Sequence, residues 1–283
     1  MPEQVSKVQE WINKKRAEKE KTTTTLQGNN NTTKIKIVGA MTAYVNKVGQ
    51  DGWVTIKVGE KNKSIYKYTK LTLTELDKTG KRVIFTIEEG AFKGQKGSMI
   101  IDNGALTYLS DTAPIINEAA KITLKYGKRE KDWKSNIRTN LNTKMPLIID
   151  QQLAILTIKD DLSVVVTLNS EWNSGRKPLK KGTYEIGLPD FPHSQEYTQA
   201  YKVGGKLNQN GTLVGGNIVK YHTVWFPIYP LSEQRYIHIG HISHGCVTII
   251  DYHKYPEIHE FLIQHRGIGK NGDTIVATLQ VDE

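Results

Sequence analysis

The chain has 283 residues, a formal net charge of +10 and a hydrophobic fraction of 37%. These values exclude a disordered chain and leave room for one large or two medium domains, each with its own core. The single cysteine excludes an internal disulfide, and because no apolar run reaches the roughly 18 residues of a membrane helix, we expect no membrane span.

The positive charge favours an anionic partner such as nucleic acid, a membrane surface or an acidic cell-wall polymer. The lysines are scattered along the chain, however, and no aromatic-basic recognition motif accompanies them. We therefore expect no nucleic-acid partner.

The chain begins with a segment whose apolar residues have helical spacing. Val5, Val8, Trp11 and Ile12 predict a short amphipathic helix within residues 3–20, which docks on the protein itself or on a partner. The stretch TTTTLQGNNNTT (22–33) is polar and without periodicity, which is typical of a linker. Residues 1–33 are thus expected to be a helix and linker.

Residues 34–145 predict a small β-rich accessory or targeting domain. Segments such as KIKIVGAMTAYV, GWVTIKVGE and KRVIFTIEEG alternate β-branched or aromatic residues with polar ones, which favours a small barrel or sandwich. DTAPIINEAAKITLKYGK contains the one helix expected in this half, and KREKDWKSNIRTNLNTK is interpreted as a polar connector. No catalytic constellation lies in this range, and a domain boundary is expected near residue 145.

Residues 146–283 predict a second domain. LAILTIKDDLSVVVTLNSEW (153–172) indicates a β-hairpin turning at Asp160 and Asp161, and GRKPLKKGTYEIG (175–187) a loop leading into a strand. YPEIHEFLIQHRG (255–267) predicts a helix that begins near Pro256 and stops before Gly267. DTIVATLQV predicts a closing strand, and we place His253, His259 and His265 on the surface.

The segment IHIGHISHGCVTII (237–250) contains the single cysteine, with histidines at 238, 241 and 244. A cysteine reacts as its thiolate, and because an ordinary thiol has a pKa of about 8.5, a nearby imidazole is needed to activate it. Gly240 and Gly245 let the chain turn so that His238 can reach Cys246. The amides of Gly245 and Cys246 are candidate donors to an oxyanion, and Gly245 would let the backbone approach a substrate closely.

Two other interpretations of the segment remain open. Cys246 can be a buried core thiol, which is a common fate of free cysteine. His238, His241 and His244 can be metal ligands only if the chain turns sharply at Gly240, because in a continuous strand residues six apart lie roughly 20 Å apart.

SHGC preceded by IHxG, with GRKPLKKGTYEIG upstream, resembles the signature of the YkuD-type L,D-transpeptidases, cysteine enzymes that cross-link or trim peptidoglycan stem peptides. The resemblance covers residues 150–283. It implies a mainly β fold: an L,D-transpeptidase-like β-sandwich or barrel with one short helix after the catalytic cysteine, preceded by the smaller β-rich domain.

The resemblance also implies roles for individual residues. Cys246 would be the nucleophile and His238 the base that forms an ion pair with it, oriented by the carbonyl of Ile239. Ser243, His244 and Gly245 would shape the site. The family commonly has arginine or asparagine two residues after the cysteine, where this chain has Thr248. No cofactor or metal is implied.

His222 is a competing candidate for the base, although it lacks the following glycine of the IHxG context. The candidate substrate-binding residues are Tyr221, His222, Trp225 and Thr248. The first three are equally well interpreted as alternating residues of a half-buried strand.

These observations predict an L,D-transpeptidase, or a carboxypeptidase or exchange enzyme, that acts on peptidoglycan stem peptides through an acyl-enzyme. The alternatives are a wall-binding or adaptor protein with a vestigial transpeptidase domain and a cysteine peptidase or amidase with other substrates. The opening segment lacks the apolar stretch of a signal peptide. We therefore expect delivery to a periplasm or cell wall as a secretion-system effector or phage-associated protein, with a secretion-apparatus or immunity protein as partner.

Overall fold

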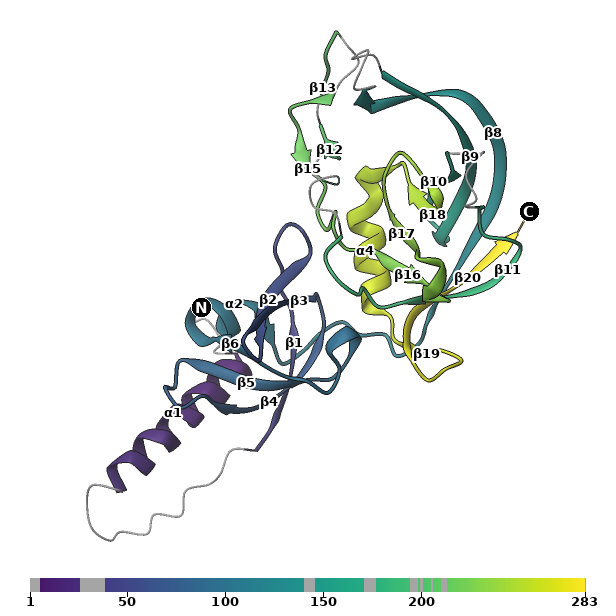
Figure 1. The fold of residues 1–283 in the computed structure, drawn as a ribbon. Coiled ribbons are helices and arrows are strands. Elements are labelled where there is room, and N and C mark those ends of the chain that lie inside the picture. Colours follow the sequence, from purple (N-terminus) through teal and green to yellow (C-terminus); the bar gives the residue numbers. More distant parts are fainter. Residues whose placement is uncertain are drawn as a thin grey trace. The chain divides into compact units, whose positions relative to one another are not determined.

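The computed structural model describes residues 6–25, 39–139, 146–170, 177–193, 198, 201–204, 206–209 and 213–282. The chain divides into two compact units, Met1–Gly49 with Trp53–Pro114 and Gln50–Gly52 with Ile115–Glu283. The chain is mainly β, as its sequence predicts (Figure 1). Among the described residues, no helix combines the length and the apolar character needed to cross a membrane.

The first unit is one antiparallel sheet with a helix packed on it. The strands follow the order β3-β2-β6-β5-β4-β1-β7. Its elements are α1 (Lys7–Thr25), β1 (Met41–Val45), β2 (Trp53–Val58), β3 (Lys61–Tyr66), β4 (Lys70–Leu76), β5 (Arg82–Ile87), η1 (Gly90–Phe92), β6 (Lys96–Ile100), η2 (Ile101–Ala105), α2 (Leu106–Tyr108) and β7 (Leu109–Ser110).

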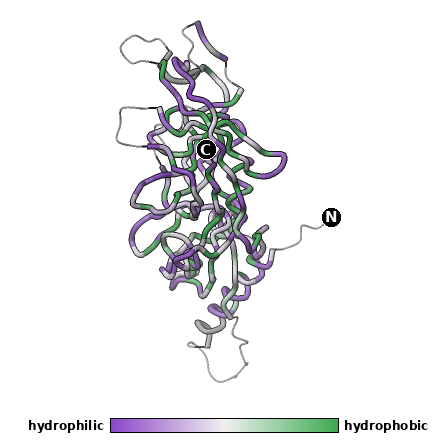
Figure 2. The backbone as a smooth tube through the Cα atoms, turned by 90° about the vertical axis from the view of Figure 1, so that its right-hand side faces the viewer, coloured by the Kyte–Doolittle hydropathy of each residue, from purple (hydrophilic) through white to green (hydrophobic). Residues whose placement is uncertain are grey.

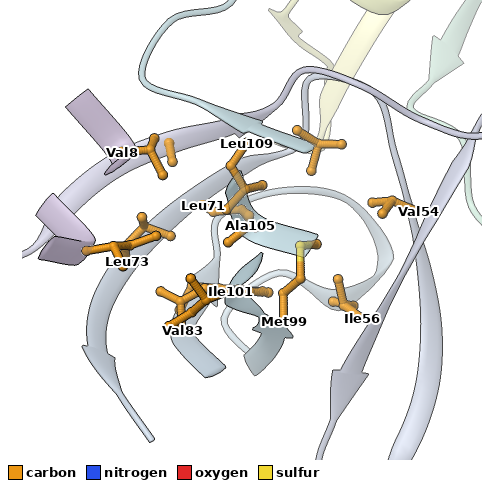
Figure 3. Packing of buried hydrophobic residues seen from close by; sticks show 14 of the residues in the cluster. Val8, Val54, Ile56, Leu71, Leu73, Val83, Met99, Ile101, Ala105 and Leu109 are labelled. Atoms are coloured by element: carbon orange, nitrogen blue, oxygen red, sulfur yellow. The ribbon is translucent and has the colours of Figure 1, made fainter. Parts of the chain in front are cut away.

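The core of the first unit is almost purely apolar. Phe85, Leu71 and Leu73 are fully buried. Figure 3 shows Val8 of α1 close to Leu71 and Leu73 of the sheet. The expected helix at the start of the chain is confirmed. Its apolar residues Val8, Trp11 and Ile12 are buried against the sheet, so it docks on its own unit.

The helix also extends into the expected linker. It ends at Thr25, so residues 22–25 are helical, whereas residues 26–33 lie outside the described residues. The first unit is a single sheet in which no pairing among the described residues joins β3 to β7, which differs from the expected barrel or sandwich.

The expected helix within residues 111–128 is wrong. Ala120, Ile122 and Leu124 are buried and alternate with exposed residues, which is the two-residue period of the strand β8 (Ala120–Thr139). The expected connector continues this strand as far as Thr139. Because β8 pairs with strands of the second unit, the chain divides at Pro114 and not near residue 145.

The second unit contains a nine-stranded sheet in the order β11-β16-β17-β18-β10-β9-β8-β20-β19. A further pairing of β11 with β20 closes the sheet into a barrel. Besides β8 the elements are β9 (Pro146–Lys159), β10 (Leu162–Asn169), β11 (Gly182–Gly187), β16 (Phe226–Ile228), η3 (Leu231–Glu233), β17 (Arg235–Ile239), β18 (His244–Ile249), η4 (Tyr252–Lys254), α4 (Tyr255–Gln264), β19 (Gly267–Ile268) and β20 (Thr274–Asp282).

Two short ribbons complete the second unit. They are β12 (Lys202–Val203) paired with β15 (Asn217–Ile218), and β13 (Lys206–Leu207) paired with β14 (Leu213–Val214). Figure 2 shows hydrophobic and hydrophilic residues alternating along much of the chain, as the pleat of half-buried strands requires.

Several expected elements of the second unit are confirmed. The β9–β10 hairpin turns at Asp160 and Asp161, α4 follows Cys246, and β20 closes the chain. The surface positions expected for His259 and His265 are wrong, because both are buried. His259 lies on the same inner face of α4 as Ile258 and Ile263, and its ring stacks on Tyr221 with centroids 4.0 Å apart.

Candidate active site

His238 and Cys246 come from neighbouring parallel strands. In the register of β17 and β18, His238 lies opposite Thr248 and Ile237 opposite Val247. Side chains two apart in a strand share a face, so Cys246 is on the face of Thr248, and Thr248 contacts His238. Cys246 is partly exposed. The strands therefore bring a thiol and an imidazole to one surface of the sheet.

The connection between the two strands is unusually short. Parallel neighbours normally need a crossover of a dozen or more residues, whereas only residues 240–243 separate β17 from β18. Five Cα steps of extended chain span about 17 Å, which is enough to return from the end of one strand to the start of the next. The loop must therefore be held in an extended path.

A buried polar network holds this loop. Gln151 donates from Nε2 to the carbonyl of His241 at 2.7 Å, and its Oε1 accepts from the hydroxyl of Ser170 at 2.6 Å. Ser170 Oγ accepts from the Ser243 amide at 2.9 Å. Ser243 Oγ in turn donates to the Cys246 carbonyl at 2.8 Å. The network links β9 and β10 to the backbone that carries the thiol.

The hydrogen bonds of His238 assign its tautomer. Nδ1 lies 2.7 Å from the carbonyl oxygen of Ile239, which only accepts, so Nδ1 carries the proton. In the neutral ring Nε2 is then the basic nitrogen, 3.2 Å from Thr248 Oγ1. Burial lowers the pKa of His238 to about 4; the Ile239 carbonyl opposes this shift and His193 adds to it. The imidazole is therefore neutral at neutral pH and available as a base.

Aromatic rings cover His238 on one side. Trp225 stacks on its imidazole with centroids 4.0 Å apart, and His193 stacks on the other face of Trp225 at 4.4 Å. Phe191, which is 53% exposed, stacks on His193 at 4.2 Å. The column runs from solvent to the buried imidazole and accounts for the desolvation that lowers the pKa of His238.

Asp190 joins two of the residues around the thiol. Its carboxylate lies 2.9 Å from His193 Nε2 and accepts a hydrogen bond from the Tyr236 hydroxyl at 3.1 Å. Burial, Asp190 and the charge of Cys246 together raise the pKa of Tyr236 to about 12. Tyr236 therefore stays protonated near the thiol, and a carboxylate, a second histidine and a phenol surround the Cys246 face.

The backbone conformation at position 245, and not access for a substrate, explains the glycine there. Its φ of +99° lies in a region that favours glycine. A Cβ here would lie 2.8 Å from the Lys177 carbonyl, so the loop between β10 and β11 already occupies this space. The expectation that Gly245 leaves room for a substrate is thus wrong for the space beside its Cα, which the Lys177 carbonyl occupies. The missing side chain instead lets the backbone at Lys177 pack against β18.

The remaining predicted site residues lie in different settings. Ser243 is buried and bonded to the cysteine backbone, whereas His244 is exposed. Trp225 contacts His238, and Thr248 is fully buried against it. Trp225 and Thr248 thus contact His238, whereas Ser243 and His244 belong to the backbone segment that leads to Cys246.

The other two candidates, His222 and Tyr221, are occupied by different partners. His222 is buried, with Nδ1 2.7 Å from Thr198 Oγ1. Burial lowers its pKa and Asp51 opposes that shift. Tyr221 donates to Glu260 of α4 at 2.6 Å and stacks on His259. Both side chains thus make these contacts with residues other than Cys246 and His238.

Sequence reasoning missed Asp190, His193, Tyr236, Gln151 and Ser170. Tyr236 could have been found, because it is two residues before His238 and shares its strand face. Asp190 and His193 lie in a segment without periodicity, so no sequence signal marks them. Gln151 lies within β9 and Ser170 directly follows β10, and their connection to the cysteine loop depends on pairing across the sheet.

No cluster of three or more histidine, cysteine, aspartate or glutamate residues suited to a metal ion occurs in the part of the chain that the structure describes. The ring of His241 lies instead among Trp133, Tyr201 and Tyr252. Comparisons with protein-family models, curated proteins and solved structures found no match to this chain.

Proposed function

We propose that the second unit is a cysteine acyltransferase of the L,D-transpeptidase type that acts on peptidoglycan stem peptides, with Cys246 as nucleophile and His238 as base. One observation carries the proposal: the Ile239 carbonyl holds the proton of His238 on Nδ1, which leaves Nε2 basic on the strand face shared with Cys246. The sequence resemblance supplies the substrate class. The proposal includes an L,D-transpeptidase-like fold for this unit.

The reaction begins when Nε2 of His238 takes the proton of the Cys246 thiol. The thiolate adds to the carbonyl of the L-centre in the bond to a terminal D-residue. Collapse of the tetrahedral intermediate breaks that bond, and the imidazolium returns its proton to the leaving amine. The amine of a second stem peptide then attacks the thioester, giving a cross-link and the free thiol. Water or a free D-amino acid would give hydrolysis or exchange.

The neutral resting state of His238 has a consequence for this scheme. Burial disfavours the imidazolium, so a permanent ion pair between His238 and the Cys246 thiolate is unfavourable in the resting enzyme. We therefore propose that the thiol transfers its proton to His238 only as the sulfur attacks the substrate. Tyr236, which Cys246 influences electrostatically, and Asp190, which accepts from the Tyr236 hydroxyl, are polar groups close to this site. They are candidates to contact the amine that leaves or enters.

The proposed place of action is a periplasm or cell wall. Delivery by a secretion system or a phage particle, with the first unit as loading or targeting module, completes the proposal. A secretion-apparatus component or an immunity protein would then be the partner. Sequencing the genes beside this one tests this part, and a gene set without secretion, phage or immunity functions would contradict it.

The test of the activity is intact-mass analysis with a stem tetrapeptide that ends in D-alanine. We expect an adduct equal to the peptide minus D-alanine, located on Cys246 by peptide mapping. A tetrapeptide ending in L-alanine is the matched control and should give none. Cys246→Ser should keep its thermal stability and form no adduct, because the hydroxyl is far less acidic than a thiol.

The base is tested by the pH dependence of iodoacetamide alkylation of Cys246. Because His238 takes the thiol proton only as the sulfur attacks, wild type should alkylate well below pH 8.5. His238→Ala should react only as the thiol itself ionises, with a pKa of about 8.5, and its acylation should fall by roughly 10³-fold or more. His222→Ala and the exposed His244→Ala should cost far less. If wild type and His238→Ala alkylate alike, the protein is not this enzyme, and the non-catalytic wall-binding alternative is favoured.

A further inference from the structure

Thr248 stands where it can act on His238 in both protonation states. It lies opposite His238 in the parallel register, it is fully buried, and its Oγ1 is 3.2 Å from Nε2. A hydroxyl both donates and accepts. It donates to Nε2 while the ring is neutral. Because Nε2 has one lone pair, the hydroxyl must rotate away before Nε2 takes the thiol proton, and Oγ1 then accepts from Nε2–H.

The orientation of this hydroxyl is set by packing. A Cβ on Gly240 would lie 2.7 Å from Thr248 Cγ2, so the threonine methyl fills the space that the glycine leaves. Threonine is branched at Cβ and has few χ1 choices. With the methyl held against Gly240, Oγ1 is held toward His238. This explains a glycine at 240 whose φ is not in the left-handed region.

Apart from Thr248, the described surroundings of His238 offer few hydrogen-bond acceptors for the Nε2–H that forms when the ring takes a proton. Trp225 covers one face of the ring, and the Ile239 carbonyl is already used by Nδ1. The titratable groups around it are Cys246 on β18, Tyr236 on β17, and His193 beyond Trp225, which Asp190 binds. His241, after β17, lies among aromatic rings.

We infer that Thr248 is a positioning residue for His238, whose hydroxyl orients Nε2 in the neutral ring and, after proton uptake, accepts from Nε2–H and so stabilises the buried imidazolium that forms when His238 acts as the base for Cys246. This inference rests on the proposed function. In the resembled family the position of Thr248 is commonly arginine or asparagine. Here we infer that residue 248 contacts the base His238 and not the substrate.

The experiment compares Thr248→Val, which keeps the branched shape and removes the hydroxyl, with Thr248→Ser, which keeps the hydroxyl. The readout is the pH profile of Cys246 alkylation by iodoacetamide, with thermal denaturation in parallel. Thr248→Val should alkylate about tenfold or more slowly at pH 7 and move toward the His238→Ala profile. Thr248→Ser should stay within about threefold of wild type.

Thr69→Val is the matched control, because Thr69 is another fully buried threonine, bonded to the Tyr66 carbonyl in the first unit. It should leave the alkylation profile unchanged. If Thr248→Val does not fold, Thr248→Ala against Thr248→Ser makes the same comparison with a smaller side chain.

The outcomes separate this inference from the function on which it rests. If wild type and His238→Ala differ but Thr248→Val or Thr248→Ala follows wild type or reacts faster, Thr248 merely competes for Nε2 and the inference alone is wrong. If wild type and His238→Ala coincide, there is no dyad and both proposals are overturned.

Discussion

The two units bury different kinds of side chain. In the first unit the buried cluster is apolar, and of the buried polar residues that the structure describes, Thr69 alone lies in that unit. The others lie in the second unit, and they include His193, His222, His238 and His241. All eight histidines of the sequence are also there.

This contrast separates an apolar scaffold from the unit that holds the proposed active site. A buried polar group destabilises the fold unless it is hydrogen-bonded, so a protein that keeps many of them in one region keeps them for a use other than stability. In the second unit Gln151, Ser170 and Ser243 bond to one another or to the loop that precedes Cys246, and Thr248 bonds to His238 on the neighbouring strand. The first unit gains its stability from apolar packing and offers no comparable chemistry among its described residues.

The largest effect is expected from the apolar core of the first unit. Phe85 is fully buried, and its ring fills the space above Gly97. Phe85→Ala should lower the free energy of unfolding of this unit by about 3–5 kcal/mol. Hydrogen exchange resolved by mass spectrometry would localise the loss, and alkylation of Cys246 in native buffer should be unchanged.

Ile100→Ala is the control for this variant, because Ile100 lies on the neighbouring strand and is 54% exposed. It should change stability little. A Phe85→Ala protein with impaired thiol reactivity would break the comparison, since the two cores would then not be separate.

The next effect concerns acid and the second unit. The pKa of His238 is lowered from 6.5 to about 4, so the unfolded chain binds a proton in a range where the folded chain does not. Above pH 6.5 this group contributes nothing, and as pH falls to about 4 it should remove roughly 3 kcal/mol of stability. His222, whose pKa burial also lowers, acts in the same direction.

Urea unfolding at a series of pH values would measure this loss. The difference between wild type and His238→Gln isolates it from the carboxylates, and the exposed His253→Gln is the control. The first unit has no histidine, so its exchange should not show this dependence between pH 6.5 and 4. Equal acid sensitivity of wild type and His238→Gln would contradict the burial argument.

The smallest effect is expected at the glycine beside the thiol. Gly245→Ala forces a side chain into a left-handed backbone and against the Lys177 carbonyl. It should cost about 1–3 kcal/mol of stability and slow the alkylation of Cys246. Gly272→Ala is the matched control, because Gly272 has a φ of +80° with open space around it. Equal costs for both would show that the Lys177 contact has no effect.

Local patterns determined much of this protein from the sequence alone. Period-two alternation predicted the strands of both halves, helical spacing predicted α1 and α4, and Asp160 with Asp161 marked the hairpin turn. The single cysteine and IHxG drew attention to Cys246 and His238. Each of these signals lies within a short stretch of chain, so it can be recognised in a single sequence without knowledge of contacts between distant residues.

Tertiary structure decided the rest. The long strand at 120–139 belongs to the second unit because it pairs with β9 and β20, which no local pattern reveals. The partners of His238 come from loops and strands far along the chain, and Asp190, His193 and Gln151 lack a sequence signal because their roles depend on spatial contacts. The depressed pKa of His238 is likewise a tertiary effect, since desolvation depends on the Trp225 ring that packs over it.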